Sequence, residues 1–267
     1  MEYGYCLNLD FLKGDTTSRI IFDAVVQTGF DYVELPFSQI SALNEKELEE
    51  LKGILKTIPC KASNLFFPPS LTLVGANMDV AGIQQYLQRM LPLASELGIQ
   101  NLVFGNGGAR KIPENESRET VWANLRTIVE LMEKYATESK VMVSVEPLNS
   151  GETNIINSYG EAVELTKGLE YVATMIDSYH IATDKQNFDD VYNSPSQMKH
   201  LHTAYPIGRM IPQPTDNTVE YSQFIQMVKQ LNYNDKISVE GAVKSTEQPT
   251  IVAEINACLA TLKGMFK

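Results

Sequence analysis

The 267-residue sequence lacks several features that would place it at a membrane or on nucleic acid. It has no apolar run near the roughly 20 residues that a membrane-spanning helix needs. Basic residues are few, with 22 Lys and Arg against 33 Asp and Glu, which gives a formal net charge of −11. A protein that binds phosphate backbones or an anionic membrane surface needs the opposite excess. We therefore expect neither a nucleic acid nor a membrane as a partner.

Cysteine is also scarce. The three cysteines, Cys6, Cys60 and Cys258, are far apart and form no CxxC pair. The amino-terminal segment has no basic stretch leading into an apolar one, so it does not predict a signal peptide. Scattered thiols of this kind are typical of a reducing compartment, where they pack as small buried hydrophobic side chains. The sequence predicts a cytoplasmic protein.

Short β-rich segments alternate with longer helical segments along the whole chain. The apolar fraction of 43% is ordinary for a soluble globular protein with a full core. We expect strands at 3–8, 32–37, 61–67, 101–105, 142–146, 172–177, 199–204 and 237–240. We expect helices at 17–30, 44–58, 79–98, 118–139, 158–168, 189–192, 221–231 and 250–266.

Eight strand–helix units without a break in composition predict one (β/α)₈ TIM barrel, an α/β fold, over residues 1–267. A doubly wound sheet is the alternative, but the first strand–helix turn has no GxGxxG phosphate-binding motif. The longest irregular connections are 68–78, 105–116 and 205–219. In a barrel all three would lie at the carboxyl end of the strands, where active sites form.

Four successive strands each end in a potential metal ligand. The segments VSVEP, MIDSYH, HLHTA and ISVEG supply Glu146, Asp177, His202 and Glu240. Carboxylates at the mouth of a barrel lose hydration, which is costly unless a cation balances them. Three carboxylates and one imidazole predict Mn²⁺, with Mg²⁺ or Co²⁺ as alternatives, and disfavour a structural zinc site. Taken singly, a Glu at a strand end is more typical of a solvated loop or a salt bridge than of a metal ligand, and a lone His is more typical of a satisfied core position.

Two nearby residues need separate assignment. His200 is an alternative to His202, because a period of two puts both on one face of the strand. His202 lies nearer the carboxyl end, so we expect it to be the ligand and His200 to lie one layer deeper. Glu34, at the end of the second strand, is expected to form an internal salt bridge.

These motifs resemble those of the xylose isomerase-like barrels, which include sugar phosphate isomerases and epimerases. Within them the sequence is most similar to the ketose 3-epimerases of the tagatose/psicose group. Residues 146–158, EPLNSGETNIINS, are similar to that group's Glu-x-x-Asn-x-x-Glu pattern followed by an apolar pair and Asn. DSYHI from Asp177 resembles its Asp-x-aromatic-His signature, and HLHTA with Arg209 and Pro212 resembles its His and downstream Arg-x-x-Pro.

The resemblance implies a metal-dependent sugar isomerase or epimerase with a small carbohydrate substrate. The four strand-end residues would hold the metal, and Glu146 and Glu240 would exchange a proton with opposite faces of one substrate carbon. Glu152 and His180 would bind the carbonyl end of the sugar, and Arg209 would bind a hydroxyl near the metal. A homodimer or homotetramer is also implied.

The sequence departs from the family pattern on the substrate side. Arg209 lies seven residues after His202, whereas the family has six. The loop FGNGGARKIPE after the fourth strand is unlike its counterpart and supplies a second cation, Arg110, which we expect to bind substrate. Its NGGAR segment suits a phosphate, a bulky glycoside or a simple tight turn. The identity of the sugar is therefore left open.

Three other functions compete with the isomerase or epimerase. A lyase or dehydratase of the same superfamily, acting on a keto-sugar, keto-inositol or 3-keto-C-glycoside, would begin with the same proton abstraction. Endonuclease IV shares this barrel, but it needs a His-rich multi-zinc site and a basic surface, whereas this chain has three histidines and a charge of −11. A binding module without catalysis is disfavoured by the presence of both Glu146 and Glu240.

Overall fold

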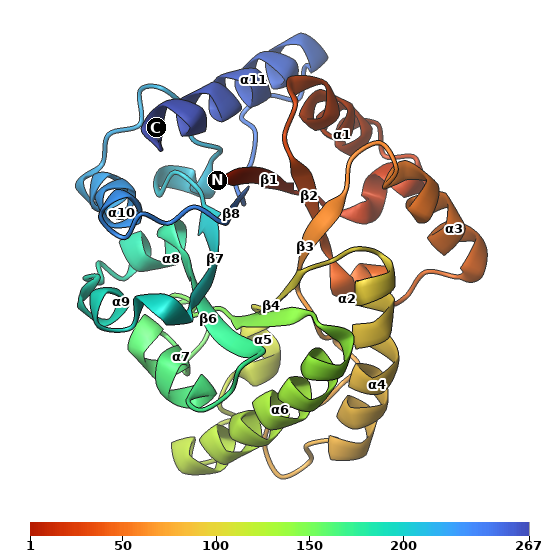
Figure 1. Cartoon of the computed structure of the whole chain (residues 1–267), viewed down its shortest axis with the longest axis vertical. Helices are drawn as coiled ribbons and strands as arrows, with labels where there is room; N and C mark the ends of the chain where they lie inside the picture. Colours follow the sequence, from red (N-terminus) through yellow and green to blue (C-terminus); the bar gives the residue numbers. More distant parts are fainter. Residues whose placement is uncertain (267) are drawn as a thin grey trace.

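The computed structural model describes residues 1–266, in which eight parallel strands close into a barrel in sequence order (Figure 1). The first and last strands pair with each other, so the sheet has no free edge. This confirms the predicted TIM barrel and rules out the doubly wound sheet. The strands are β1 (Glu2–Cys6), β2 (Tyr32–Pro36), β3 (Cys60–Asn64), β4 (Asn101–Phe104), β5 (Met142–Val145), β6 (Val172–Asp177), β7 (Met198–Thr203) and β8 (Lys236–Val239).

Helices surround the barrel, and the last one packs beside the first to complete the outer ring (Figure 1). The helices that connect successive strands or end the chain are α1 (Thr16–Thr28), α3 (Glu45–Ile54), α4 (Val80–Glu96), α6 (Arg118–Ser139), α7 (Tyr159–Thr166), α9 (Asp189–Asn193), α10 (Val219–Gln230) and α11 (Gln248–Met265). Shorter turns lie within the loops: α2 (Phe37–Ile40), α5 (Gly107–Arg110), α8 (Ser178–Thr183), and the 3₁₀ helices η1 (Leu9–Lys13), η2 (Pro195–Gln197) and η3 (Ile207–Arg209).

Most element boundaries lie within a few residues of the predicted ones, and the exceptions have local causes. The third strand was expected to continue to residue 67 but ends at Asn64, because Leu65 has a left-handed backbone with a φ of 45°. The predicted helix from residue 44 begins after an Asn44 cap that forms a full capping box with Glu47. It ends at Ile54, earlier than predicted. The short helix α8 was not predicted.

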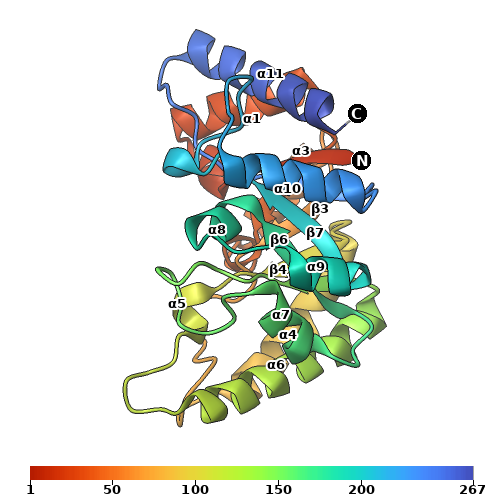
Figure 2. The same ribbon diagram turned by 90° about the vertical axis from the view of Figure 1, so that its left-hand side faces the viewer.

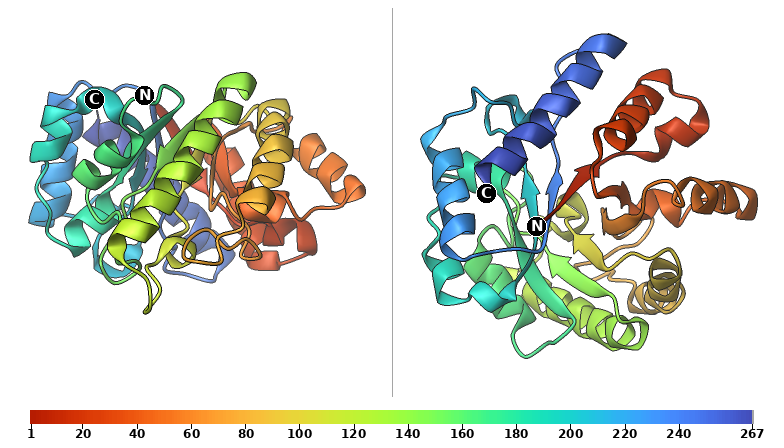
Figure 3. Two further views of the ribbon diagram at one scale, coloured as in Figure 1. Left: turned by 90° about the horizontal axis from the view of Figure 1, so that it is seen from below. Right: turned by 45° about the horizontal axis from the view of Figure 1, so that its top comes forward.

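The loops that carry the site all lie at one end of the barrel. Figure 2 shows α5 and α8 at the end opposite the one where β1 begins. In the left view of Figure 3 the connections after β3 and β4 extend from that same end. Across residues 1–266 no helix combines the length and apolar character needed to cross a bilayer. Cys60 and Cys258 are buried as expected, Cys6 is half-buried, and all three are free thiols.

The packing of side chains inside the barrel requires a glycine in β1. A Cβ at Gly4 in β1 would lie 2.1 Å from Cε2 of Tyr32, whose ring is fully buried and hydrogen-bonded to Ser238 at 2.8 Å. Moving the ring aside would break this hydrogen bond and disturb the packed core around it. Only a residue without a side chain fits at Gly4, because interiors are packed at the density of crystals.

We expect Gly4→Ala to lower the free energy of unfolding by about 1–3 kcal/mol, the usual cost of overpacking a core. Chemical denaturation followed by circular dichroism measures this change. The matched control is Gly53→Ala in α3, where a Cβ meets no atom within 4 Å. The free energy of unfolding of that variant should rise by about 0.5–1 kcal/mol, because alanine has a higher helix propensity than glycine. Equal stability of the two variants would contradict the prediction.

Candidate active site

Four ligand-type side chains converge at the carboxyl end of the barrel. Glu146, Asp177, His202 and Glu240 each offer one ligand atom, and these atoms all lie within 4.8 Å of one another. Nδ1 of His202 is 3.3 Å from Oε1 of Glu146 and 3.1 Å from Oε2 of Glu240. The structure therefore brings together the four residues that the sequence predicts as a metal site.

Strand register explains this convergence. Asp177 at the end of β6 pairs with His202 in β7, and His202 pairs with Ser238 in β8. Glu240 follows Ser238 by two residues, so its side chain is expected on the same face of the strand. Because all eight strands are parallel and closed into a ring, their carboxyl ends share one rim.

The cluster carries more negative charge than its neighbours balance. Burial alone would raise the pKa of Glu240, but the adjacent His202 and Arg209 outweigh this effect and lower it to about 2. Burial also raises the pKa of Asp177, which His180 and Arg209 only partly offset. Nη2 of Arg209 lies 2.7 Å from Glu240 and 3.3 Å from Asp177. Further positive charge in this position would stabilise the carboxylates.

Nε2 of His202, on the side of the ring away from the cluster, contacts the carboxylate of Glu34. Nε2 of His202 lies 2.9 Å from Oε1 of Glu34, and Nε2 of His200 lies 2.9 Å from Oε2. Ser238 donates to the same Oε2 at 2.6 Å. Glu34 and its three partners, His200, His202 and Ser238, are fully buried. Burial raises the pKa of Glu34, but the two imidazoles outweigh it and keep the carboxylate ionised.

This network confirms that Glu34 forms an internal salt bridge and that His200 lies one layer below His202. Sequence reasoning did not connect Glu34 with His202, although its position at the carboxyl end of β2 was the available signal. Because Glu34 holds one proton of His202 on Nε2, a metal bound in the cluster would displace the other proton and meet the lone pair of Nδ1. That tautomer is the one a metal requires, and carboxylate–histidine pairs of this kind commonly support metal ligands.

The donor set fits a divalent cation. Three carboxylates and one imidazole suit Mn²⁺, Mg²⁺ or Co²⁺, and four protein ligands leave positions for substrate oxygens. A second group of potential ligands, Cys6 and Glu34 with the shared His202, is less suitable because both Glu34 oxygens already bind imidazoles. Glu146, Asp177, His202 and Glu240 could therefore hold the metal.

His180 and Glu152 lie beside the cluster, linked by Asn149. Nε2 of His180 is 3.5 Å from Asp177 and 3.8 Å from Glu146. The amide of Asn149 lies 2.8 Å from Nδ1 of His180 and donates to Glu152 at 2.9 Å. Sequence reasoning gave Asn149 no role, although it is the Asn of the EPLN motif.

Arg209 reaches the cluster in spite of its longer spacing from His202. Gly208 and Arg209 both have left-handed backbones, with φ of 76° and 48°. Tyr205 and Met210 pair across this turn, so the extra residue is absorbed in a tight loop. The guanidinium of Arg209 also lies 4.7 Å from the ring centroid of Tyr179. A left-handed non-glycine residue is strained, and such strain is common at functional sites.

The prediction that Arg110 binds substrate is wrong. Its side chain is fully buried, and its guanidinium donates to the backbone carbonyls of Phe104, at 2.9 Å, and of Glu146. Burial lowers the pKa of Arg110 to about 10. The local chain turns as α5, which directs the guanidinium beneath the ends of β4 and β5 and away from the mouth of the barrel. Arg110 supports the backbone of the catalytic candidate Glu146.

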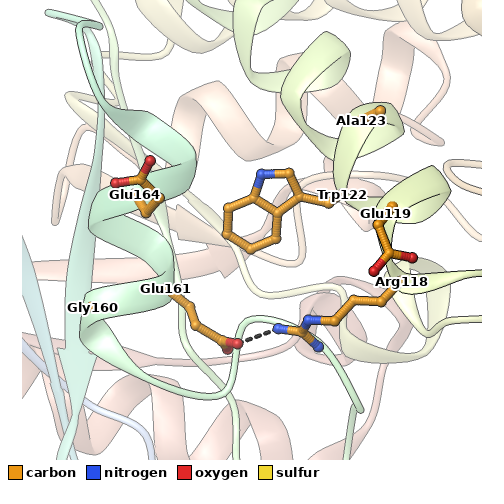
Figure 4. Close-up of a pocket in the computed structure, with 7 residues that line it drawn as sticks. All are labelled: Arg118, Glu119, Trp122, Ala123, Gly160, Glu161 and Glu164. Atoms are coloured by element: carbon orange, nitrogen blue, oxygen red, sulfur yellow. Dashed lines mark hydrogen bonds and ion pairs between the residues drawn. The ribbon is translucent and has the colours of Figure 1, made fainter.

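A separate groove of about 550 Å³ lies on the outer surface between α6 and α7. Figure 4 shows the Trp122 indole between the two helices, near an ion pair of Arg118 with Glu161. No residue of the metal-ligand cluster lines this groove. Trp122 packs between helices, as expected.

Comparisons with known proteins place this geometry in a family. The chain is 23% identical over 238 residues to D-psicose 3-epimerase of Enterocloster bolteae, covering 82% of this chain and 74% of that protein. It is 20% identical over 189 residues to 3-dehydro-D-guloside 4-epimerase of Escherichia coli, covering 67% of this chain and 71% of that protein. The crystal structure of D-psicose 3-epimerase with D-tagatose, from Clostridium cellulolyticum H10, superposes with a TM-score of 0.80 at 18% identity, covering 100% of both chains.

A family model described as the xylose isomerase-like TIM barrel matches residues 22–262. This match spans most of the chain, including the strands that supply the four-residue cluster. The chain belongs to the xylose isomerase-like TIM barrel family.

Proposed function

We propose that this protein is a divalent-metal-dependent sugar epimerase that inverts the carbon next to the carbonyl of a ketose or keto-glycoside. The observation that carries this proposal is the approach of Glu146 and Glu240 to one point from two sides. They follow β5 and β8, which two other strands separate, yet both lie within 3.3 Å of Nδ1 of His202. A substrate carbon between them would expose opposite faces to two carboxylates.

The reaction divides into two proton transfers. One glutamate removes the proton from the carbon next to the carbonyl, and the C–H electron pair forms a carbon–carbon double bond while the carbonyl electrons move to oxygen. The second glutamate returns a proton to the opposite face, which re-forms the carbonyl with inverted configuration. When bound, a divalent cation would stabilise the negative charge that develops on the enediolate oxygens. Proton transfer by positioned carboxylates commonly contributes about 10²–10⁴-fold.

The neighbouring side chains would orient the sugar. The amide of Asn149 donates to Nδ1 of His180, so Nε2 carries the proton and faces the cluster, where it can donate to a carbonyl oxygen. Glu152 and Arg209 contact each other at 3.5 Å and would bind sugar hydroxyls. For His180 and Arg209 these are the roles that the family resemblance implies, whereas the resemblance assigns Glu152 to the carbonyl end of the sugar.

The finer assignments rest on donor chemistry and on the relatives. Mn²⁺ is the metal we propose, with Mg²⁺ or Co²⁺ as alternatives, because oxygen donors predominate. The two relatives described above are epimerases, which favours epimerisation over the lyase chemistry that would share its first step. A cytoplasmic location, a homodimer or homotetramer, and the lack of nucleic-acid or membrane partners stay predictions of the sequence.

Glu146→Gln and Glu240→Gln are each expected to lower kcat for epimerisation by about 10²–10⁴-fold. Each variant keeps one base, so in D₂O it should still exchange the reacting C–H of one epimer of the substrate pair, and the two variants should differ in which one. Proton NMR at saturating Mn²⁺, with bound metal measured in parallel, separates lost proton transfer from lost metal. The exposed Glu138→Gln is the control. A kcat within tenfold of wild type in either variant would overturn the two-base assignment.

Glu34→Gln is expected to weaken Mn²⁺ binding by about 10–100-fold, because it removes the charge that orients His202. Isothermal titration of chelator-stripped protein measures the Kd without any sugar. Tyr32→Phe is the matched control, because it removes only a hydroxyl that bonds to Ser238. It should change the Kd far less. An unchanged Kd in a folded Glu34→Gln variant, with folding checked by circular dichroism, would refute this role.

A further inference from the structure

A cavity of about 460 Å³ lies near the metal-ligand cluster, among the loops that follow three of the strands. Residues from the loops after β3, β4 and β5 line it, among them Leu65, Phe67, Pro69, Gly105, Gly108 and Glu152. Its volume lies within the range of about 300–1,000 Å³ that is typical of small-molecule sites. Residues 106–109 of the NGGAR segment thus form one wall of this space.

The cavity adjoins the candidate active site through Gly105 and Glu152. A Cβ on Gly105 would lie 2.0 Å from Oε2 of Glu146, so the chain passes directly against a proposed proton-transfer group. At the other side Oε1 of Glu152 lies 3.7 Å from His180 and 3.5 Å from Arg209. A sugar held over the cluster would therefore direct one end into this cavity.

The charge of the lining disfavours a phosphate. Glu152 is the only ionisable residue among the residues that line the cavity, and it is acidic. The nearby cation of this loop, Arg110, is fully buried and donates to backbone carbonyls. The helix α5 has only four residues and therefore little dipole to offer an anion. An uncharged group fits this lining better than a dianion.

The walls are mostly apolar, and hydrogen bonds tie two of the loops together. Asn106 accepts a bond from the Phe67 amide at 3.1 Å and donates to the Phe67 carbonyl at 2.9 Å, which ties the β3 and β4 loops together. Leu65 keeps 43% of its surface exposed and has a left-handed φ of 45°. Strain of this kind in a bulky residue persists where the surroundings impose it, often at a ligand clamp. Rigid apolar walls favour the CH-rich face of a ring.

We propose that this cavity binds an uncharged ring attached to the reacting sugar, so that the substrate class is keto-glycosides and sugar phosphates are excluded. The proposal rests on the epimerase function, and it resolves the choice between phosphate and glycoside that the NGGAR segment left open. Gly108 is then a specificity-determining position. A Cβ there meets no heavy atom within 4 Å, so a larger side chain can be added without a clash at that atom.

The test compares three substrates in Mn²⁺-loaded protein: a free ketose, the corresponding ketose phosphate and a 3-keto-glucoside that carries an uncharged aryl ring. Binding is measured by titration calorimetry and turnover by NMR. We expect the keto-glucoside to bind at least tenfold more tightly than the phosphate. Gly108→Leu should reduce the preference for keto-glucoside over free ketose by about 10-fold or more, the usual effect of altering an apolar pocket. Gly53→Leu on α3, also in open space, is the control and should leave the preference unchanged.

The outcomes separate this proposal from the function on which it rests. Equal or tighter binding of the phosphate, or a Gly108→Leu preference equal to wild type, would overturn the cavity assignment even if a ketose is epimerised. The expected binding pattern without any change of configuration would keep the cavity assignment and overturn the epimerase. Circular dichroism checks that the Gly108→Leu variant is folded. Leu65→Ala removes the opposite wall of the cavity and should independently lower the preference for keto-glucoside over free ketose.

Discussion

The buried carboxylate of Glu34 is the interaction on which the site depends. It lies inside the barrel between the imidazoles of His200 and His202, at 2.9 Å from each. An ionised group in such a place would be costly alone, but two imidazoles and the hydroxyl of Ser238 satisfy it. In return it fixes the ring of His202, whose Nδ1 then faces the three carboxylates of the cluster. The polar interior layer and the candidate metal centre are thus one continuous network.

The candidate centre is built by strand ends, whereas the loops above it decide access. Strand register brings Asp177, His202 and Glu240 together, and β5, which pairs with β6, adds Glu146. The loops after β3 and β4 are tied by Asn106 and form the apolar cavity beside Glu146. This division allows one proton-transfer centre to serve different sugars, because the loops can vary without moving the ligands. The proposed substrate class depends only on residues of these loops.

The two arginines show how local chain geometry redirects a side chain of the same chemistry. Arg209 turns toward Asp177 and Glu240 because two successive left-handed residues shorten its loop. Arg110 follows a short helix that points its guanidinium inward, onto the carbonyls of Phe104 and Glu146. Both are loop cations at the carboxyl end of the barrel, and spacing from the preceding strand does not distinguish them. One lies at the candidate site, and the other supports it from beneath.

The sequence by itself determined the barrel and the four candidate ligands, because the alternation of strands and helices and the position of each strand end are local patterns. The cap at Asn44 and the deeper place of His200 followed from the same local rules. Only the tertiary structure decided that Glu34 supports His202, that Asn149 links His180 to Glu152, and that Arg110 is buried. Those facts depend on φ values in loops and on contacts between strands distant in the chain. Periodicity indicates the face of a strand or helix on which a side chain lies, but it does not give the direction of a side chain in a loop.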